Sequence, residues 1–92
     1  MGVVVSSPSV HASVVLLTYN QEEFVEDALR SLLEQDYPDL QIVVSDDNSQ
    51  DGTWQVVNSV ADAYQGEKKI TLNRNSQNLG IGANYAKALR LI

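Results

Sequence analysis

The sequence predicts an α/β fold in which a parallel sheet forms the middle of three layers and the elements follow the order β-α-β-α-β-α. Three short apolar runs alternate with three stretches whose apolar residues recur at helical spacing. The runs are continuous, which is typical of parallel strands that are buried on both faces. Parallel strands need right-handed crossover connections, and the intervening helices provide them.

Two strands and one helix are predicted in the first half of the chain. The strands are "ASVVLLTYN", from residue 12, and "LQIVVSD", residues 40–46. Asn20 can cap the helix between them, with Glu23 reaching back as in a capping box. This helix must end before Pro38, and its apolar positions are Phe24, Ala28, Leu29, Leu32 and Leu33.

The second half supplies the other two helices and the third strand. A helix is expected to begin near Asp51 or Thr53 and to end before Gly66, with one side formed by Trp54, Val57, Ala61 and Tyr64. The third strand is "KKITLNRN", residues 68–75. After Gly80 the last helix follows, with a face formed by Ile81, Tyr85, Ala88, Leu89 and Ile92.

Composition limits the class of protein. The 92 residues make one small domain, and the net charge of −6 argues against nucleic acid or an anionic membrane surface as a partner. No cysteine is present, which is compatible with a reducing compartment, and no apolar run approaches the about 20 residues of a membrane span. Residues 1–11 lack the features of a signal peptide. We expect a flexible leader there, and a cytoplasmic protein.

Polar segments follow the first two predicted strands. "TYN", residues 18–20, ends the first strand, and "DDNSQDGT", residues 46–53, ends the second. In open α/β sheets, ligands bind outside the carboxyl ends of the strands. We therefore expect both segments to face one crevice.

The acidic loop has two further interpretations. Counted from Asp47, a calcium loop would find Ser49, Asp51 and Gly52 at suitable places, but Asn58 stands where a bidentate Glu is needed. A simple turn with an N-cap would also use Asp and Ser side chains.

The glycines near the last helix also have two interpretations. "GIGANY", residues 80–85, resembles a dinucleotide motif, but its third glycine is replaced by Tyr85 and it follows the third strand, not the first. Alternatively, Gly80 and Gly82 allow a tight entry into the helix.

Residues 12–92 together resemble a known family. The T-Y-N turn, the D-D-x-S-x-D-G-T loop and the N-x-G-x-G opening of the last helix occur in the order found in the N-terminal half of the glycosyltransferase family 2 nucleotide-binding domain, the GT-A fold. The resemblance implies a Rossmann-like sheet with strand order 3-2-1. It also implies the donor-binding portion of an inverting hexosyltransferase that transfers a sugar to an acceptor hydroxyl.

The resemblance also implies a partner and its contacts. The partner is a nucleotide-diphosphate sugar, UDP- or GDP-linked. Thr18, Tyr19 and Asn20 would line the base, with Glu22 nearby. Asp47 would accept a hydrogen bond from a ring N–H of uracil or guanine.

Four further residues complete the expected binding site. Asp46 adjoins the base-binding carboxylate and is expected to be mainly structural. Asn78 and Gly80 would approach the donor from the last helix, and Arg74 would either reach a phosphate or remain a solvated surface side chain. The loop itself is expected to be tied down by Ser49, Asp51 and Thr53.

The resembled family places its catalytic groups later in the chain. A D-x-D motif there holds a divalent metal, Mg or Mn, on the diphosphate, and a later carboxylate acts as general base. Neither is present in this sequence, since Asp46 and Asp47 lie one strand too early. The chain alone is therefore expected to be inactive. The alternative to a donor-binding half is a catalytically silent, truncated nucleotide-binding or interaction module.

One edge of the first predicted strand would be unpaired in this chain. In the resembled fold a later strand pairs with its free side, so residues 13–17 would present an open apolar edge. The edge could be hidden by a twofold homodimer, by exchange of an element between chains, or by "MGVVVSS" folding back as an added strand. We expect the homodimer, because a twofold contact is the commonest way to bury one self-complementary surface.

Overall fold

The computed structural model of the chain describes residues 2–6, 12–36 and 39–92. Its elements are β1 (Gly2–Ser6), β2 (Ala12–Thr18), α1 (Val25–Leu33), β3 (Leu40–Asp46), α2 (Thr53–Ala63), β4 (Lys69–Arg74) and α3 (Ile81–Leu89). From β2 onward the order is β-α-β-α-β-α, which confirms the predicted alternation. Within these residues, no helix has the length and apolar character needed to cross a membrane.

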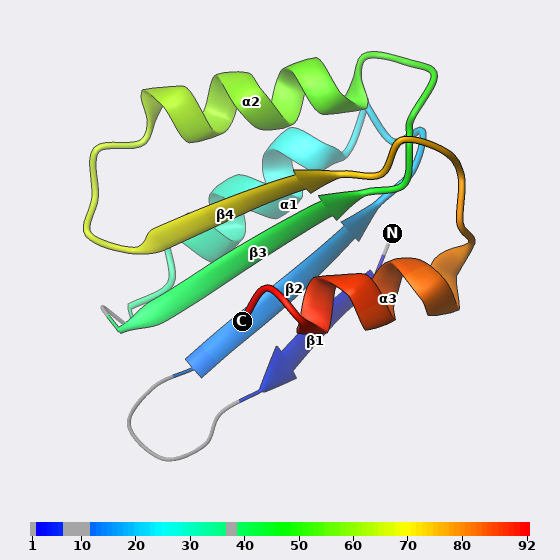
Figure 1. Cartoon of the computed structure of the whole chain (residues 1–92). Coiled ribbons are helices and arrows are strands. Elements are labelled where there is room, and N and C mark those ends of the chain that lie inside the picture. Colours follow the sequence, from blue (N-terminus) through cyan, green and yellow to red (C-terminus); the bar gives the residue numbers. More distant parts are fainter. Residues whose placement is uncertain (1, 7–11, 37–38) are drawn as a thin grey trace.

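The elements form one four-stranded sheet with helices on both faces. The strand order is β1-β2-β3-β4, in which β2, β3 and β4 are parallel and β1 is antiparallel to β2. Helices α1 and α2 cover one face, and α3 lies on the other (Figure 1). The predicted order was 3-2-1 in a sheet of three strands. In the structure the three predicted strands are β2, β3 and β4, and they stand in the order one, two, three when counted from the edge at which β1 is added as a further strand.

The apolar core is divided between the two faces of the sheet. Along β2, Val14 and Leu16 belong to the cluster beneath α1 and α2, whereas Val15 and Leu17 pack with Ala88 of α3. This alternation follows from the two-residue period of a strand. Because both faces are covered, all seven residues of β2 and all seven of β3 are buried, as their continuous apolar runs predicted.

Strand β1 bears on two expectations. Its five residues pair with β2, from Gly2 opposite Leu17 to Ser6 opposite Ser13. Residues 2–6 of the expected flexible leader are therefore paired, while residues 7–11 lie outside the described part of the chain. The homodimer was expected because this edge of β2 would be open, and β1 occupies that edge. The third of the three ways of hiding the edge is the one observed.

The start of α1 also differs from the prediction. Asn20 and Glu23 do not form a capping box, since the helix begins at Val25 and its N-cap residue, Phe24, makes no side-chain cap bond. Phe24 is 63% exposed, and the buried positions are Val25, Leu29 and Leu33. Val25 takes the place of the predicted Phe24 on the buried face, whereas Leu29 and Leu33 are buried as predicted. The chain just before the helix makes other contacts, since the N–H groups of residues 20–22 bond side chains that follow β3.

The buried face of α3 was also predicted only in part. Ala88 is buried, and Tyr85 packs against the apolar cluster on that face of the sheet. Ile81, Leu89 and Ile92 are exposed. A polar residue, Asn84, takes the second buried position of the helix, for a reason that lies in the site below.

Candidate functional site

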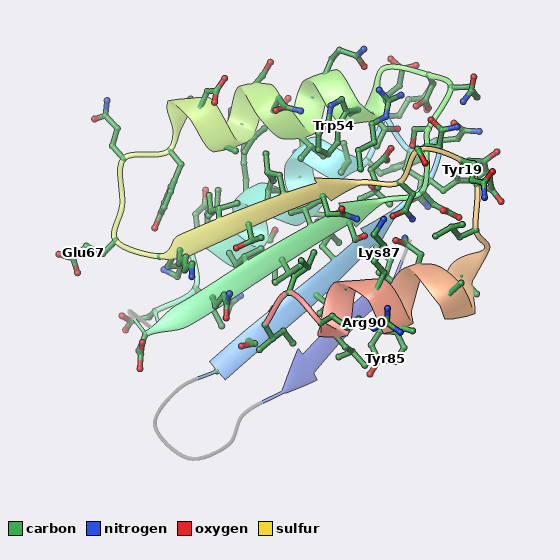
Figure 2. The ribbon with its side chains drawn as sticks, in the orientation of Figure 1. Tyr19, Trp54, Glu67, Tyr85, Lys87 and Arg90 are labelled. Carbon is green, nitrogen blue, oxygen red and sulfur yellow. The ribbon has the colours of Figure 1, made fainter. Side chains whose placement is uncertain are left out.

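A cleft opens at the carboxyl ends of β2 and β3, where they meet the N-terminus of α3. Its volume is about 330 Å³, and it is lined by Leu17, Thr18, Tyr19, Asp47, Asn78, Gly80, Ile81 and Asn84. Tyr19 lies at the end of the sheet toward which the arrows of β2, β3 and β4 point (Figure 2). Its side chain is 43% exposed, so an aromatic ring is available at the cleft. Five of the predicted site residues therefore line one hollow.

Asp47 is the charged group of the cleft. Its Oδ1 accepts hydrogen bonds from Asn75 Nδ2 at 2.9 Å and from the backbone N–H of Leu79 at 2.8 Å. Its Oδ2 accepts one from the backbone N–H of Gly80 at 2.9 Å. Burial disfavours ionisation of this carboxyl, but the bonds from Asn75, Leu79 and Gly80 outweigh it and lower the pKa of Asp47. Asp47 is therefore a carboxylate at neutral pH, with only acceptor capacity.

Two buried asparagines hold Asp47 in place, and sequence reasoning missed both. Asn75 is 1% exposed and Asn84 is 2% exposed. Asn75 Nδ2 donates to Asp47 Oδ1 and to Asn84 Oδ1, both at 2.9 Å. Asn84 Oδ1 also accepts a 2.6 Å bond from Ser45 Oγ, and Asn84 Nδ2 donates to Ser45 O at 3.0 Å. An asparagine at a helical core spacing was the available signal, because a buried amide needs partners.

Asp46 has a structural position. It is fully buried, and its Oδ1 accepts from Thr18 Oγ1 at 2.7 Å and from Ser49 Oγ at 2.6 Å. Its Oδ2 accepts from the backbone N–H of Ser49 at 2.8 Å. This carboxylate therefore joins the end of β2 to the loop after β3. It does not line the cleft.

Arg74 is exposed and does not line the cleft. Its Nη2 donates to Ser49 O at 3.0 Å, and its Nε lies 3.8 Å from Asp46 Oδ2. The guanidinium carbon is 5.9 Å from the centre of the Trp54 ring, which lies between α2 and the sheet (Figure 2). Arg74 thus supports the acidic loop from the side of α2.

The loops after β2 and β3 are held together by reciprocal bonds. The backbone N–H of Asn20 donates to Ser49 Oγ at 2.9 Å, and Asn20 Oδ1 accepts from the N–H of Gln50 at 2.8 Å. The N–H of Gln21 donates to Thr53 Oγ1 at 2.7 Å. Asn20 has a positive φ of 51°, a conformation that Asn tolerates well. Asn20 therefore bridges two loops, which is why it does not cap α1.

Asp51 anchors the start of α2 to the same loop. Its Oδ1 accepts from the backbone N–H and the hydroxyl of Thr53, and its Oδ2 accepts from the N–H of Glu22 at 3.3 Å. Desolvation opposes ionisation, yet these bonds prevail and lower the pKa of Asp51. The Glu22 side chain is exposed and lies beside Gly52 and a separate shallow hollow. The ties predicted for Ser49, Asp51 and Thr53 are confirmed.

The acidic loop does not fit a metal ion. The three acceptor bonds of Asp46 and the three of Asp47 come from N–H and O–H donors, and Asn58 Nδ2 donates to Trp54 O. Among residues 2–6, 12–36 and 39–92, no group of three or more His, Cys, Asp or Glu side chains could hold an ion. The calcium interpretation is therefore not supported.

The site combines an exposed tyrosine, a fixed carboxylate and the open start of a helix. Gly80, with φ of 88°, turns its N–H toward Asp47, and nothing lies within 4 Å of the place where a side chain would begin. Such a hollow suits a planar ring that carries an N–H donor. It is an aromatic-and-carboxylate cleft at the carboxyl edge of an α/β sheet, where this fold class binds its ligands.

The family model for glycosyl transferase family 2 matches residues 13–92. The chain belongs to this family. It is 46% identical over 48 residues to the Campylobacter jejuni GalNAc(5)-diNAcBac-PP-undecaprenol beta-1,3-glucosyltransferase, and this match covers 52% of the chain and 16% of that protein. It is 33% identical over 81 residues to the abequosyltransferase RfbV of Salmonella typhimurium, covering 86% of the chain and 24% of that protein.

A solved structure has the same fold. The mannosyltransferase PcManGT from Pyrobaculum calidifontis, in complex with GDP-Man and Mn²⁺, superposes with a TM-score of 0.81 at 33% identity. The match covers 87% of the chain and 24% of that protein. The chain thus spans about a quarter or less of each of these three proteins.

Proposed function

We propose that this chain is the donor-binding portion of an inverting glycosyltransferase that transfers a hexose from a nucleotide-diphosphate sugar to an acceptor hydroxyl. The observation that carries the proposal is Asp47, a buried carboxylate that lines the cleft beside Tyr19. Oδ2 has a single donor among the described residues, Gly80, and so keeps room for one more. A base with a ring N–H supplies that donor.

The other cleft residues have supporting roles in this proposal. The Tyr19 ring offers a face on which a base can stack. Asn78 and Gly80, at the entrance to α3, lie where the ribose or diphosphate would follow the base. The similarity to a glucosyltransferase and to a mannosyltransferase bound to GDP-Man supports a hexose donor linked to UDP or GDP.

The metal of such an enzyme has to be held elsewhere. The similar mannosyltransferase contains Mn²⁺, but Asp46 and Asp47 each accept three hydrogen bonds from the protein, and among the described residues no group of three or more His, Cys, Asp or Glu side chains could hold an ion. We therefore propose that a divalent cation, Mg²⁺ or Mn²⁺, takes its ligands from another part of the longer enzyme. Thr18, Asn20, Glu22, Asp46 and Arg74 then shape the donor site, most of them by bonding the loops around it.

Nucleotide titration of the purified chain tests the proposal. NMR shifts of backbone amides would report the Kd for UDP and for GDP. Asp47→Ala should weaken the nucleotide that binds by about 1 to 3 kcal/mol, because its ring N–H loses a charged acceptor. Asp62→Ala removes the same charge from an exposed position of α2 and should leave the Kd unchanged. Equal affinities of wild type and Asp47→Ala, at equal stability, would contradict the assigned role.

A further inference from the structure

The hydrogen bonds that Asp47 already accepts determine how many acceptor positions its carboxylate has left for a ligand. An ionised carboxylate offers about four acceptor positions, two on each oxygen. Oδ1 already has two donors, Asn75 Nδ2 and Leu79 N–H, while Oδ2 has one, Gly80 N–H. Three positions are therefore filled by the described residues. The fourth, on Oδ2, is left for a ligand.

The Asp47 side chain is held in one orientation, so it cannot rotate to open an acceptor position on its other oxygen. Asn75 is oriented by Asn84 Oδ1, to which it donates, and by Asn73 Nδ2, from which its Oδ1 accepts at 3.0 Å. The backbone N–H of Asp47 itself donates to Thr18 O at 2.9 Å. Turning the side chain of Asp47 would break bonds on both oxygens, and the buried donors left behind would be unsatisfied.

We propose that Asn75 is a positioning residue that leaves Asp47 a single free acceptor position, so that the cleft selects uracil and discriminates against guanine. This inference rests on the proposed function, because it names the base of the donor bound at the same cleft. It narrows the donor class from UDP- or GDP-linked sugars to UDP-linked sugars.

The edges of the bases explain the selection. Guanine presents two adjacent donors, N1–H and N2–H, and their parallel pairing with a carboxylate needs one open position on each oxygen. Uracil presents one donor, N3–H, between two carbonyl oxygens, and needs only Oδ2. Asn78 Nδ2 donates to Asp47 O at 3.4 Å and carries a second hydrogen for a flanking carbonyl. Cytosine and adenine would place a ring-nitrogen acceptor against the carboxylate, which repels it.

Titration with matched nucleotides is the first test. The purified chain is titrated with UDP, GDP, CDP and N3-methyl-UDP, with the Kd read from NMR shifts. UDP should bind about tenfold or more tightly than GDP or CDP, because the loss or mispairing of one charge-assisted hydrogen bond has about this effect. N3-methyl-UDP, which lacks the N3–H, should lose the same factor.

The role of Asn75 is tested by a ratio of affinities. In Asn75→Ala one position on Oδ1 opens, so the GDP affinity relative to UDP should rise about tenfold. Asn58→Ala, an identical change on α2 away from the cleft, should leave the ratio unchanged. A partly unfolded variant still reports correctly, since both nucleotides bind the same folded population and the ratio cancels it.

Each outcome decides between the two proposals. If GDP binds as tightly as UDP, or if N3-methyl-UDP binds as well as UDP, the selection of uracil is wrong while the donor site stands. An unchanged ratio in Asn75→Ala would overturn the role of Asn75. Absence of binding by every nucleotide would overturn the proposed function and this inference with it. If Asn75→Ala does not fold, the comparison of UDP with N3-methyl-UDP still decides the base.

Discussion

Asp46 and Asp47 are neighbours in the chain but face opposite sides of the sheet end, because successive side chains of a strand alternate. Asp46 turns toward Thr18 and Ser49 and is closed to solvent. Asp47 turns toward the entrance of α3 and the cleft. One carboxylate therefore holds the loops together, and the other is left to meet a ligand.

Removal of Asp46 should destabilise the fold. Asp46→Ala leaves the Thr18 hydroxyl and both donors of Ser49 without their buried acceptor, and we expect a loss of about 3 kcal/mol in the free energy of unfolding. Urea denaturation measures it, with Asp62→Ala as the exposed control. A loss of less than about 0.5 kcal/mol, the range of ordinary surface changes, would mean that this carboxylate does not hold the loops.

The lowered pKa of Asp47 predicts a pH dependence. Because the pKa in the folded state is below the unfolded value, about 3.9, ionised Asp47 stabilises the fold fully above that value. The contribution is lost as the pH falls through the folded pKa. Unfolding free energies of wild type and Asp47→Asn should therefore differ most above about pH 4 and converge in more acid solution. Asp51 is present in both proteins, so its own titration cancels. A constant difference from pH 7 to pH 3 would contradict this assignment.

At the scale of elements, the two glycines of "GIGANY" have different roles at the start of α3. Gly80 has φ of 88° and ψ of 162°, a conformation that is nearly exclusive to glycine and costs other residues about 1 to 3 kcal/mol, and its N–H bonds to Asp47. Gly82 is inside α3, and no atom lies within 4 Å of the place its Cβ would occupy. The two glycines therefore differ in what they do.

Alanine substitutions at the two glycines should change the free energy of unfolding in opposite directions. Gly80→Ala is expected to destabilise the fold by about 1 to 3 kcal/mol. Gly82→Ala is expected to stabilise it by about 0.5 kcal/mol, because glycine inside a helix is unfavourable relative to alanine. Urea denaturation without ligand measures both, and each variant serves as the control for the other. Equal effects of the two changes would show that the conformation of Gly80 is not the reason for its glycine.

The elements that the sequence predicts well are those whose signal is local. The buried strands β2 and β3 follow from continuous aliphatic runs. The start of α1 does not, because Asn20 finds its partners at Ser49 and Gln50, about thirty positions away. The residues of the candidate site divide in the same way. Asp47 was expected from its motif, whereas Asn75 and Asn84 act through contacts that only the folded chain creates.

At the scale of the whole molecule, β1 covers one edge of the sheet and α3 covers one face, although the chain spans only a small part of its longer relatives. β1 pairs with the edge of β2, so the chain does not need a second copy to cover it. The cleft lies at the carboxyl ends of β2 and β3. It is lined by the end of β2, by the residues that directly follow β2 and β3, and by the start of α3 with the loop before it. The proposed donor binding can therefore be tested apart from the rest of the reaction.

That separation predicts a chain that binds nucleotide without transferring sugar. Transfer needs a base for the acceptor hydroxyl and stabilisation of the leaving diphosphate. In the described part of the chain, Asp46 and Asp47 each accept three hydrogen bonds from the protein, and no group of three or more His, Cys, Asp or Glu side chains could hold a metal ion. Purified chain incubated with Mn²⁺ or Mg²⁺ and a panel of nucleotide sugars should give no transfer or hydrolysis above a blank, while the NMR titration still detects nucleotide. The Asp47→Ala variant, tested in parallel, should also give no turnover, and its NMR titration should show the weaker nucleotide binding predicted above. Turnover by the wild type that Asp47→Ala abolishes would place catalytic groups within these 92 residues and would refute the assignment of the chain to donor binding alone.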